Sequence, residues 1–218
     1  MNTKNNIIKL NGVIIGAKDY GDYDKLLTIL TKDKGKICVY AFNVRKSNSK
    51  NIGKIGLFTY GTFEVRENKE RFNLENVELK EDFYDLSKDY ENMCYASYFI
   101  ELANYVTFEN LDCDEIIDLL YFAFKALIKG KIDRRLIRRV FELKIIKYQG
   151  EYKDSDSLLD KNETLRYTWD FVIMNLPQKI FTFKLSDEIY EKFESEVDME
   201  MKDKIGKKFK SIEQINNL

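Results

Sequence analysis

Two apolar stretches joined by a tight basic turn constrain the fold of this chain most strongly. Residues 26–31 are apolar and β-branched, and residues 37–44 are again rich in residues that favour strands. Between them Gly35 can adopt a positive φ without steric cost, which suits a hairpin turn. The pattern predicts two antiparallel strands, followed by a polar, basic loop at residues 45–54 that we expect to be mobile.

Further short stretches with a two-residue period flank this hairpin. Residues 7–17 precede it, and residues 57–66 and 71–80 follow it, the last with a change of phase that is typical of a bulge. About five short strands within about 80 residues, with no helical period among them, favour a small closed barrel. We expect a five-stranded OB-fold, with an SH3-like barrel as the alternative.

The hydrophobic period changes after residue 82. Apolar residues then recur every three or four positions, which predicts helices. The expected helix ends are marked by Gly130, Gly150 and Pro177. The chain is therefore predicted to belong to the α+β class and to have two domains. An N-terminal OB-fold β-barrel at residues 1–82 is followed by an all-α helical bundle at residues 83–218.

The residue types exclude several kinds of catalytic and metal site. The chain has no histidine, which excludes His-based triads and His-ligated zinc. No C-x-x-C pair and no Walker or Rossmann glycine pattern occurs. Three cysteines are expected to be reduced and mostly buried: Cys38, Cys94 and Cys113. No cofactor and no metal are expected, and we interpret the protein as a non-enzyme.

One acidic cluster leaves a weaker enzymatic alternative. Asp19, Asp22 and Asp24 lie close together, but they lack the rest of a calcium-binding loop and a strand follows at once. We interpret them as turn formers that accept backbone hydrogen bonds. An enzyme that uses these carboxylates alone is the alternative. The N-terminal residues are polar, and no apolar run approaches the ~20 residues that cross a bilayer. A cytoplasmic protein with no membrane partner is therefore expected.

Charge is segregated along the chain, although the net charge is −1. Residues 1–54 carry eleven Lys/Arg against four Asp/Glu, and residues 125–147 carry nine against two. Residues 75–92 carry two basic residues against seven acids. Blocks of this kind indicate a polyanionic partner, whereas a solvated face explains any single block equally well.

Basic and aromatic residues are interleaved in the predicted barrel. The cations are Lys32, Lys34, Lys36, Arg45, Lys46, Lys50 and Lys54, and the aromatic residues are Tyr20, Tyr23, Tyr40 and Phe42. A single-strand-binding protein needs cations that contact phosphates and aromatic faces on which bases stack. We favour a core position for Tyr40 and Phe42, and phosphate contact for Arg45 and Lys46. Lysines that only protect sheet edges are the alternative.

The predicted third helix carries a second basic cluster. Its members are Arg134, Arg135, Arg138 and Arg139. At about 100° per residue, Arg135 and Arg139 border the apolar stripe, whereas Arg134 and Arg138 point away. Arginines beside an apolar groove suit a short acidic peptide that ends in an aromatic residue. DNA phosphates, or an exposed helix face that pairs with Asp133 and Glu142, are the alternatives.

The order of several motifs resembles the RecO family. The motifs are D-Y-G-x-x-D-K-L-L-T-x-L-T at 19–31, G-K at 35–36, R-K-S at 45–47, Y-A-S-Y-x-x-E-L at 95–102, R-V-F-E-L-K at 139–144, T-L-R-Y at 164–167, F-T-F-K-L-S at 181–186 and G-K-K-F-K-S at 206–211. The resemblance covers nearly the whole chain. It implies a non-enzymatic recombination mediator that acts in DNA repair, in the bacterial cytoplasm and at the nucleoid.

The resemblance also implies partners. RecO proteins bind single- and double-stranded DNA, anneal complementary strands and act with RecR to load recombinase onto DNA coated by single-stranded DNA-binding protein (SSB). They recognise the acidic C-terminal tail of SSB. By position, Arg45 and Lys46 match the family's basic loop, and we add Lys32, Lys34, Lys36 and Lys50 as DNA-binding candidates. Arg135 and Arg139 are the candidates for the SSB tail, on the groove argument. The alternative function is an OB-fold adaptor that binds proteins and never contacts nucleic acid.

One departure from the family concerns zinc. Many RecO proteins carry a four-cysteine zinc module just after the F-E-L helix, whereas residues 150–162 contain no cysteine here. We therefore predict no metal, with residues 150–163 forming either a shortened loop or a metal-free remnant of the module.

Overall fold

The computed structural model describes residues 7–68, 71–150 and 152–217. The chain divides into two compact units. Met1–Tyr84 with Asn104–Ile117 form the first, here called the barrel unit, and Asp85–Ala103 with Asp118–Leu218 form the second, the helical unit. The segment 104–117 thus belongs to the unit that contains the strands, although it lies far along the chain. We retain the division between residues 82 and 83 as a proposal for the functional domains.

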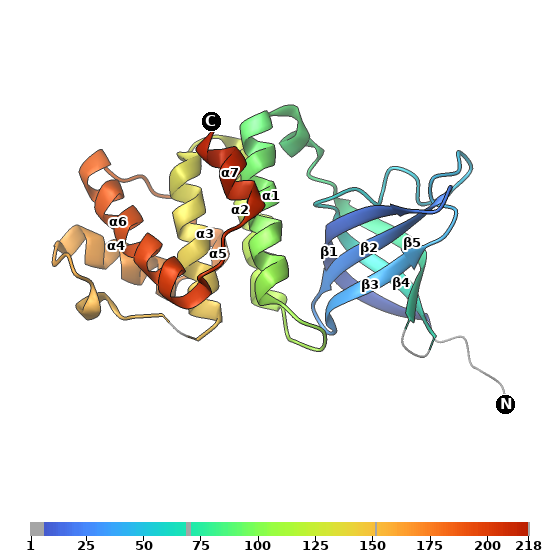
Figure 1. Cartoon of the computed structure of the whole chain (residues 1–218), viewed down its shortest axis with the longest axis horizontal. Coiled ribbons are helices and arrows are strands. Elements are labelled where there is room, and N and C mark those ends of the chain that lie inside the picture. Colours follow the sequence, from blue (N-terminus) through green and yellow to red (C-terminus); the bar gives the residue numbers. More distant parts are fainter. Residues whose placement is uncertain (1–6, 69–70, 151, 218) are drawn as a thin grey trace. The chain divides into compact units, whose positions relative to one another are not determined.

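Five strands close into a barrel, as expected (Figure 1). They are β1 (Ile7–Tyr20), β2 (Asp24–Thr31), β3 (Gly35–Ala41), β4 (Tyr60–Asn68) and β5 (Arg71–Glu81). Their order around the barrel is β1-β2-β3-β5-β4, and β4 pairs with β1 to complete it. All pairings are antiparallel except that of β3 with β5. This closed barrel agrees with an OB-fold.

Alternating side chains build the barrel core. Buried members from all five strands include Ile14, Leu27, Ile29, Val39, Phe63, Val65 and Val77. The predicted bulge is present, since the register of β4 with β5 shifts between Glu64 and Val65. The β2–β3 hairpin is also confirmed. Strand β3 is shorter than predicted: it ends at Ala41, and Asn43 adopts a positive φ of 53°. Phe42 and Asn43 therefore lead out of the sheet.

Gly35 is required in the turn between β2 and β3. Its φ is +65°, and a Cβ atom there would lie 2.2 Å from the carbonyl oxygen of Phe108. This close approach arises because residues 104–117 run against the turn: the backbone N–H of Lys36 donates to Phe108 O at 3.0 Å, and that of Asn110 donates to Lys34 O at 2.8 Å. Glycine therefore serves both the turn and the packing of this later segment.

All the helices of the described chain follow the barrel strands in the sequence. The α-helices are α1 (Tyr90–Val106), α2 (Asp114–Lys129), α3 (Arg134–Tyr148), α4 (Glu163–Met174), α5 (Pro177–Ile180), α6 (Asp187–Glu200) and α7 (Lys210–Asn216). Short turns of other helix types are η1 (Tyr84–Lys88), η2 (Ser155–Ser157) and the π-helical η3 (Met201–Ile205). As predicted, α2 and α3 end just before Gly130 and Gly150, and α4 ends before Pro177.

Stacked aromatic rings fill the core of the helical unit. The rings of Phe99 and Phe141 stack at 4.3 Å, and Trp169 meets Phe193 edge-on at 6.1 Å. Buried Lys144 donates from Nζ to the carbonyl oxygens of Val172, Ile173 and Asn175, which satisfies the C-terminal end of α4. Within the described ranges, no helix is both long and apolar enough to span a membrane.

Candidate nucleic-acid interface and peptide groove

The outer face of β3 presents polar and aromatic side chains. Val39 and Ala41 are buried in the barrel core, whereas Lys36, Cys38 and Tyr40 lie on the outside. This alternation follows from the two-residue period of a strand. The face therefore combines a cation, a thiol and an aromatic ring within one short strand.

Three aromatic rings form a cluster at the end of this face. Tyr40 stacks on Phe42 with ring centres 6.1 Å apart and an interplanar angle of 12°, and Tyr20 meets Tyr40 edge-on at 5.7 Å. Phe42 is 51% exposed and Tyr20 is 52% exposed. The expectation that Tyr40 and Phe42 are core residues is wrong, because Ala41 occupies the inward position and its two neighbours face outward. We call Tyr20, Tyr40 and Phe42 the aromatic cluster.

Cations lie over Tyr40 of the aromatic cluster and over Tyr23, another exposed ring of the barrel unit. The Cζ atom of Arg71 lies 5.9 Å from the ring centre of Tyr40, and Nζ of Lys46 lies 5.1 Å from that of Tyr23. Arg45 pairs with Asp19 at 3.3 Å and is exposed. Arg71 was not among the residues predicted from the sequence, because only the parallel pairing of β3 with β5 brings it beside Tyr40. The structure thus places Arg45, Lys46 and Arg71 near exposed aromatic rings.

The carboxylates in this region take part in local contacts. Asp24 accepts the backbone N–H of Asn43 at 2.7 Å, as expected of a turn former. Asp19 also pairs with Lys25 at 2.9 Å. The hydrogen bond from Lys25 lowers the pKa of Asp19, and the charge of Arg45 lowers it further. In the part of the chain that the structure describes, no three Cys, Asp or Glu side chains gather as metal ligands would.

The turn lysines lie at the other end of β3. Lys36 and Tyr40 are four positions apart along β3, or about 13 Å, and Lys32 and Lys34 precede the strand. Lys32 pairs with Asp114 at 3.5 Å, Lys34 pairs with Glu67 at 3.2 Å, and Nζ of Lys36 donates to the carbonyl oxygen of Asn104 at 2.6 Å. The DNA-binding candidates therefore fall into two groups, and the turn group already has protein partners.

The segment after β3 is anchored, contrary to the expectation of a mobile loop. Val44, Asn51 and Ile55 are buried, and Asn51 Oδ1 accepts the backbone N–H of Val77 at 3.2 Å. Lys50 remains exposed on this segment. Arg45, Lys46 and Lys50 are therefore displayed on a backbone that the barrel holds in place.

A groove opens at the start of α3 in the helical unit. It has a volume of about 710 Å³. Its charged lining consists of four cations, Lys131, Arg134, Arg135 and Lys184, and three carboxylates, Glu91, Asp133 and Asp187. Its less polar lining includes Tyr95, Ile132, Leu136, Leu185, Tyr190 and Ile215. An apolar floor with cations at its edge is suited to an acidic peptide with a hydrophobic end.

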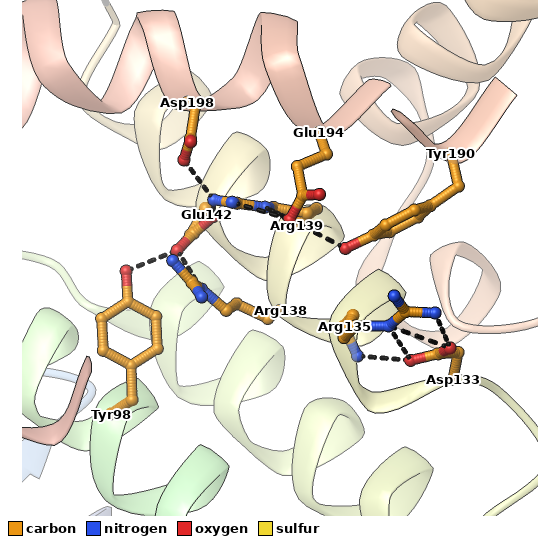
Figure 2. Close-up of polar contacts among 9 residues, drawn as sticks. All are labelled: Tyr98, Asp133, Arg135, Arg138, Arg139, Glu142, Tyr190, Glu194 and Asp198. Carbon is orange, nitrogen blue, oxygen red and sulfur yellow. Dashed lines mark hydrogen bonds and ion pairs between the residues drawn. The ribbon is translucent and has the colours of Figure 1, made fainter. Parts of the chain in front are cut away.

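Arg135 (Figure 2) is an exposed cation of this groove, as are Lys131 and Lys184. Its side chain is 61% exposed, and Nη2 donates to Asp133 Oδ2 at 2.9 Å. Its Cζ lies 5.0 Å from the ring centre of Tyr190. The hydrogen bond from Arg135 lowers the pKa of Asp133, so this carboxylate is charged at neutral pH. Asp133 and Tyr190 thus hold the guanidinium in one orientation.

Arg139 lies in a buried ionic cluster, not on the groove (Figure 2). Its side chain is 5% exposed and contacts Glu142 at 2.8 Å, Glu194 at 2.8 Å and Asp198 at 2.6 Å. Glu194 also accepts the hydroxyl of Tyr190 at 2.9 Å. The structure therefore separates the two tail-binding candidates. Arg135 can contact a ligand directly, whereas Arg139 reaches the groove only through Glu194 and Tyr190.

The other two arginines of α3 do not point into solvent as expected. Arg138 donates to Glu142 at 2.8 Å and lies 5.4 Å from the ring centre of Tyr98. Arg134 contacts Asp89 at 2.7 Å and Glu91 at 2.8 Å. Arg134, Arg138 and Arg139 thus form ion pairs with carboxylates of α1, α3 and α6 and with Asp89, which precedes α1. The alternative of an ion-paired helix face is closer to what the structure shows.

The buried carboxylate of Glu142 also receives a hydrogen bond from Tyr98. Tyr98 Oη donates to Glu142 Oε1 at 2.6 Å (Figure 2). Burial raises the pKa of Tyr98 well above its usual range, and the charge of Glu142 raises it further. The Y-A-S-Y and R-V-F-E-L-K motifs therefore meet at this hydrogen bond in the core of the helical unit.

The residues at the position of the zinc module do not fit a zinc site. Glu196, which is buried, accepts the backbone N–H groups of Leu159 and Asp160 and the ammonium group of Lys153. Trp169 Nε1 donates to the carbonyl oxygen of Lys153 at 3.0 Å. Residues 150–163 contain neither cysteine nor histidine, so thiolate and imidazole ligands are missing. A carboxylate from α6 organises this loop.

A closed OB-fold barrel followed by an all-α unit defines a two-part α+β class of protein. Two family models match the chain: "Recombination protein O N terminal" at residues 4–83 and "Recombination protein O C terminal" at residues 87–171. The chain belongs to the RecO family.

Curated relatives agree with this assignment. The DNA repair protein RecO of Alkaliphilus metalliredigens is 30% identical over 165 residues, which are 76% of this chain and 67% of that protein. Those of Acetivibrio thermocellus and Clostridium novyi are 28% and 30% identical over 145 and 144 residues, each 66% of this chain. The matched regions span 58% and 56% of these two relatives. Membership in this family supports a role in DNA repair or recombination.

Proposed function

We propose that this protein is a recombination mediator that binds single- and double-stranded DNA and anneals complementary strands. With RecR, it helps to load recombinase onto DNA coated by SSB. The observation that carries the proposal is the aromatic cluster with Arg45, Lys46 and Arg71 around it, on the barrel of a chain that belongs to the RecO family.

The aromatic cluster has the chemistry of a stacking platform. Each base that stacks on an aromatic ring contributes roughly 1–3 kcal/mol, and every base offers such a face. In OB-folds the face of strands 2 and 3 is the usual site for oligonucleotides. Phe42 and Tyr20 are exposed, so both rings are accessible to bases. Binding of single strands with little sequence preference follows from this arrangement.

The cations of the barrel unit take different roles in the proposal. Arg45 and Lys46 contact phosphates beside the aromatic cluster, with Lys50 further along the same segment. Lys32, Lys34 and Lys36 contact phosphates at the far end of β3. The partners of these turn lysines must be exchanged for phosphate oxygens, so we assign each of them a smaller contribution than Arg45 or Lys46.

The groove of the helical unit is proposed to bind the acidic tail of SSB. Arg135 offers a planar guanidinium to a carboxylate, and the apolar lining receives a hydrophobic end residue. Arg139 acts as a positioning residue, because it holds Glu194 and through it Tyr190. We propose no catalytic activity, no metal and no cofactor, and a cytoplasmic protein associated with the nucleoid.

Binding of an oligo-dT strand at a series of salt concentrations tests the DNA-binding face. The variant is Arg45→Ala with Lys46→Ala, and the matched control is Lys88→Ala with Lys161→Ala, two exposed lysines of the helical unit. Each phosphate contact contributes about 0.7 to the slope of log affinity against log salt, so the variant should lose roughly 1.4. An unchanged affinity and slope would overturn the assignment. No binding by the unaltered protein at low salt would favour the adaptor function.

A further inference from the structure

A dense group of lysines lies near the C-terminal end of the helical unit. Residues 202–210, here called the lysine segment, run from η3 to the start of α7. They contain five lysines: Lys202, Lys204, Lys207, Lys208 and Lys210. All five are exposed, and Asp203 is the only acidic residue of the segment. The segment lies beyond the regions that the two family models match.

The backbone of the lysine segment is held in place by contacts with the rest of the helical unit. Gly206 adopts a φ of +62°, and its N–H donates to Met201 O at 3.0 Å. Phe209 is buried and meets the ring of Tyr98 edge-on at 5.7 Å. At the start of α7, drawn in red in Figure 1, the backbone N–H of Ser211 donates to Glu101 at 3.1 Å. Fixed anchors with exposed charges between them form a preorganised basic surface.

The lysine segment differs from the arginines of α3 in the exposure of its charged groups. On α3, Arg134 contacts two carboxylates, Arg138 contacts one and Arg139 contacts three. In the lysine segment, Lys204 pairs with neighbouring Asp203 at 3.0 Å, and Nζ of Lys207 lies 5.5 Å from the ring centre of Phe209. All five lysines of the segment are exposed, whereas Arg138 and Arg139 of α3 are largely buried against carboxylates.

We propose that the lysine segment is a second nucleic-acid contact, which binds the phosphate backbone of DNA. This proposal rests on the function proposed above and adds a site on the helical unit. Lysine ammonium groups are point charges that neutralise phosphates without reading bases. The only aromatic residue of the segment, Phe209, is buried and offers no face for stacking. The segment therefore suits the duplex, which carries more phosphate charge per unit length than a single strand, whereas the aromatic cluster suits unpaired bases.

A second contact of this kind has a direct use in annealing. The barrel can hold unpaired bases of a strand, while the lysine segment holds the backbone of the duplex that has already formed. Its contribution should be strongly dependent on salt, since each neutralised phosphate of a duplex adds about 0.9 to the log–log slope.

The test compares duplex and single-strand binding in two matched triple variants of the full chain. The first is Lys202→Gln with Lys207→Gln and Lys208→Gln. The control is Lys88→Gln with Lys161→Gln and Lys179→Gln, three exposed lysines elsewhere in the helical unit. Both sets remove three charges. For the first variant we expect duplex affinity to fall on the order of ten-fold, with a slope smaller by about 2.7. Its affinity for oligo-dT should stay within two-fold of the control.

Three results would overturn this inference. Duplex affinity equal to that of the control variant would show that the lysines do not contact DNA. An equal loss for oligo-dT and duplex would show that the segment is not a separate site. Competition by poly-glutamate as strong as that by duplex DNA would reassign the surface to an acidic protein. If the unaltered protein bound neither DNA, the proposed function itself would fail, which is a different outcome from loss in the variant alone.

Discussion

The guanidinium of Arg135 lies over the ring of Tyr190, with its Cζ 5.0 Å from the ring centre. The hydroxyl of Tyr190 donates to Glu194, which also accepts from Arg139 at 2.8 Å. An exposed cation of the groove is thus connected to a buried cation through two side chains of α6 (Figure 2). This connection explains how two arginines on one helix can serve the same site in different ways.

Replacing each arginine in turn should separate these roles. Arg139→Leu should reduce the free energy of unfolding by about 3–5 kcal/mol, because buried Glu142 loses a partner. Arg135→Leu should change it by less than about 0.5 kcal/mol, because the side chain is mostly solvated. Urea unfolding at neutral pH measures both values. Equal losses in the two variants would contradict the assignment of Arg139 to the core.

The exposed arginine of the groove should also be needed for binding of an acidic peptide. Arg135→Leu should weaken binding of an SSB-tail peptide by roughly 10- to 100-fold, the value of a lost hydrogen bond between charged groups. Isothermal titration calorimetry measures the affinity, with Lys161→Leu as an exposed control outside the groove. If Arg135→Leu binds the peptide as tightly as the control, the groove does not use this cation.

Removing one ring from the aromatic cluster should weaken single-strand binding. Phe42→Ala should cost roughly 1–3 kcal/mol of affinity for oligo-dT, the contribution of one stacked base. The melting temperature should hardly change, because Phe42 is half exposed. Tyr84→Ala provides the control, since Tyr84 is an exposed aromatic residue of the same unit. Matching losses for the two variants would mean that the cluster is not a specific platform.

The anchor between α1 and α7 should depend on pH. Burial by itself raises the pKa of Glu101, but hydrogen bonds from Ser211 and Lys210 outweigh it, and the pKa is lowered overall. A lowered pKa stabilises the fold above the unfolded value of about 4.3, and this stability is lost as pH falls through the folded pKa. Glu101→Gln should therefore cost about 1–2 kcal/mol at pH 7, and the difference should shrink below about pH 4.

Urea unfolding of Glu101→Gln and of the unaltered chain between pH 7 and pH 3.5 measures this difference. Glu213→Gln, on the exposed side of α7, serves as the control and should show no such trend. A difference that stayed constant across this range would mean that the charge of Glu101 is not what holds the start of α7.

The three cysteines should report on the DNA-binding face. Cys38 is exposed on β3, whereas Cys94 and Cys113 are buried. Burial, with the charges of Asp112 and Asp114, raises the pKa of the Cys113 thiol to about 11, so it should react slowly. At pH 7.5 a maleimide should label Cys38 first, and saturating oligo-dT should protect it several-fold. Mass spectrometry after tryptic digestion identifies the site. Full reactivity of Cys38 in the complex would place the DNA elsewhere.

Local patterns were sufficient to predict the elements but not the environment of their side chains. The two-residue period and the glycine turn predict the barrel, because both act between neighbouring residues. Phe42 was assigned to the core because a hydrophobic residue after a strand can face either side, and only the observed register decides. Arg71 was missed because its neighbour Tyr40 comes from a strand thirty residues earlier.

The arginines of α3 show the same limit more clearly. Helical spacing correctly placed Arg139 beside the apolar stripe, but two of the three carboxylates that it contacts belong to α6, more than fifty residues later. Nothing in the local sequence distinguishes an arginine that meets such partners from one that faces solvent. The lysine segment was visible in the sequence, yet its exposure and its anchors became clear only in the fold.

Annealing of complementary oligonucleotides coated with the cognate SSB tests the central claim most directly. The protein should accelerate annealing, and the acceleration should disappear when the acidic tail of SSB is deleted, because Arg135 then has no ligand. The protein should also accelerate annealing of naked oligonucleotides, because that reaction involves no SSB. Failure of the folded protein to accelerate annealing of naked strands at low salt would contradict the account.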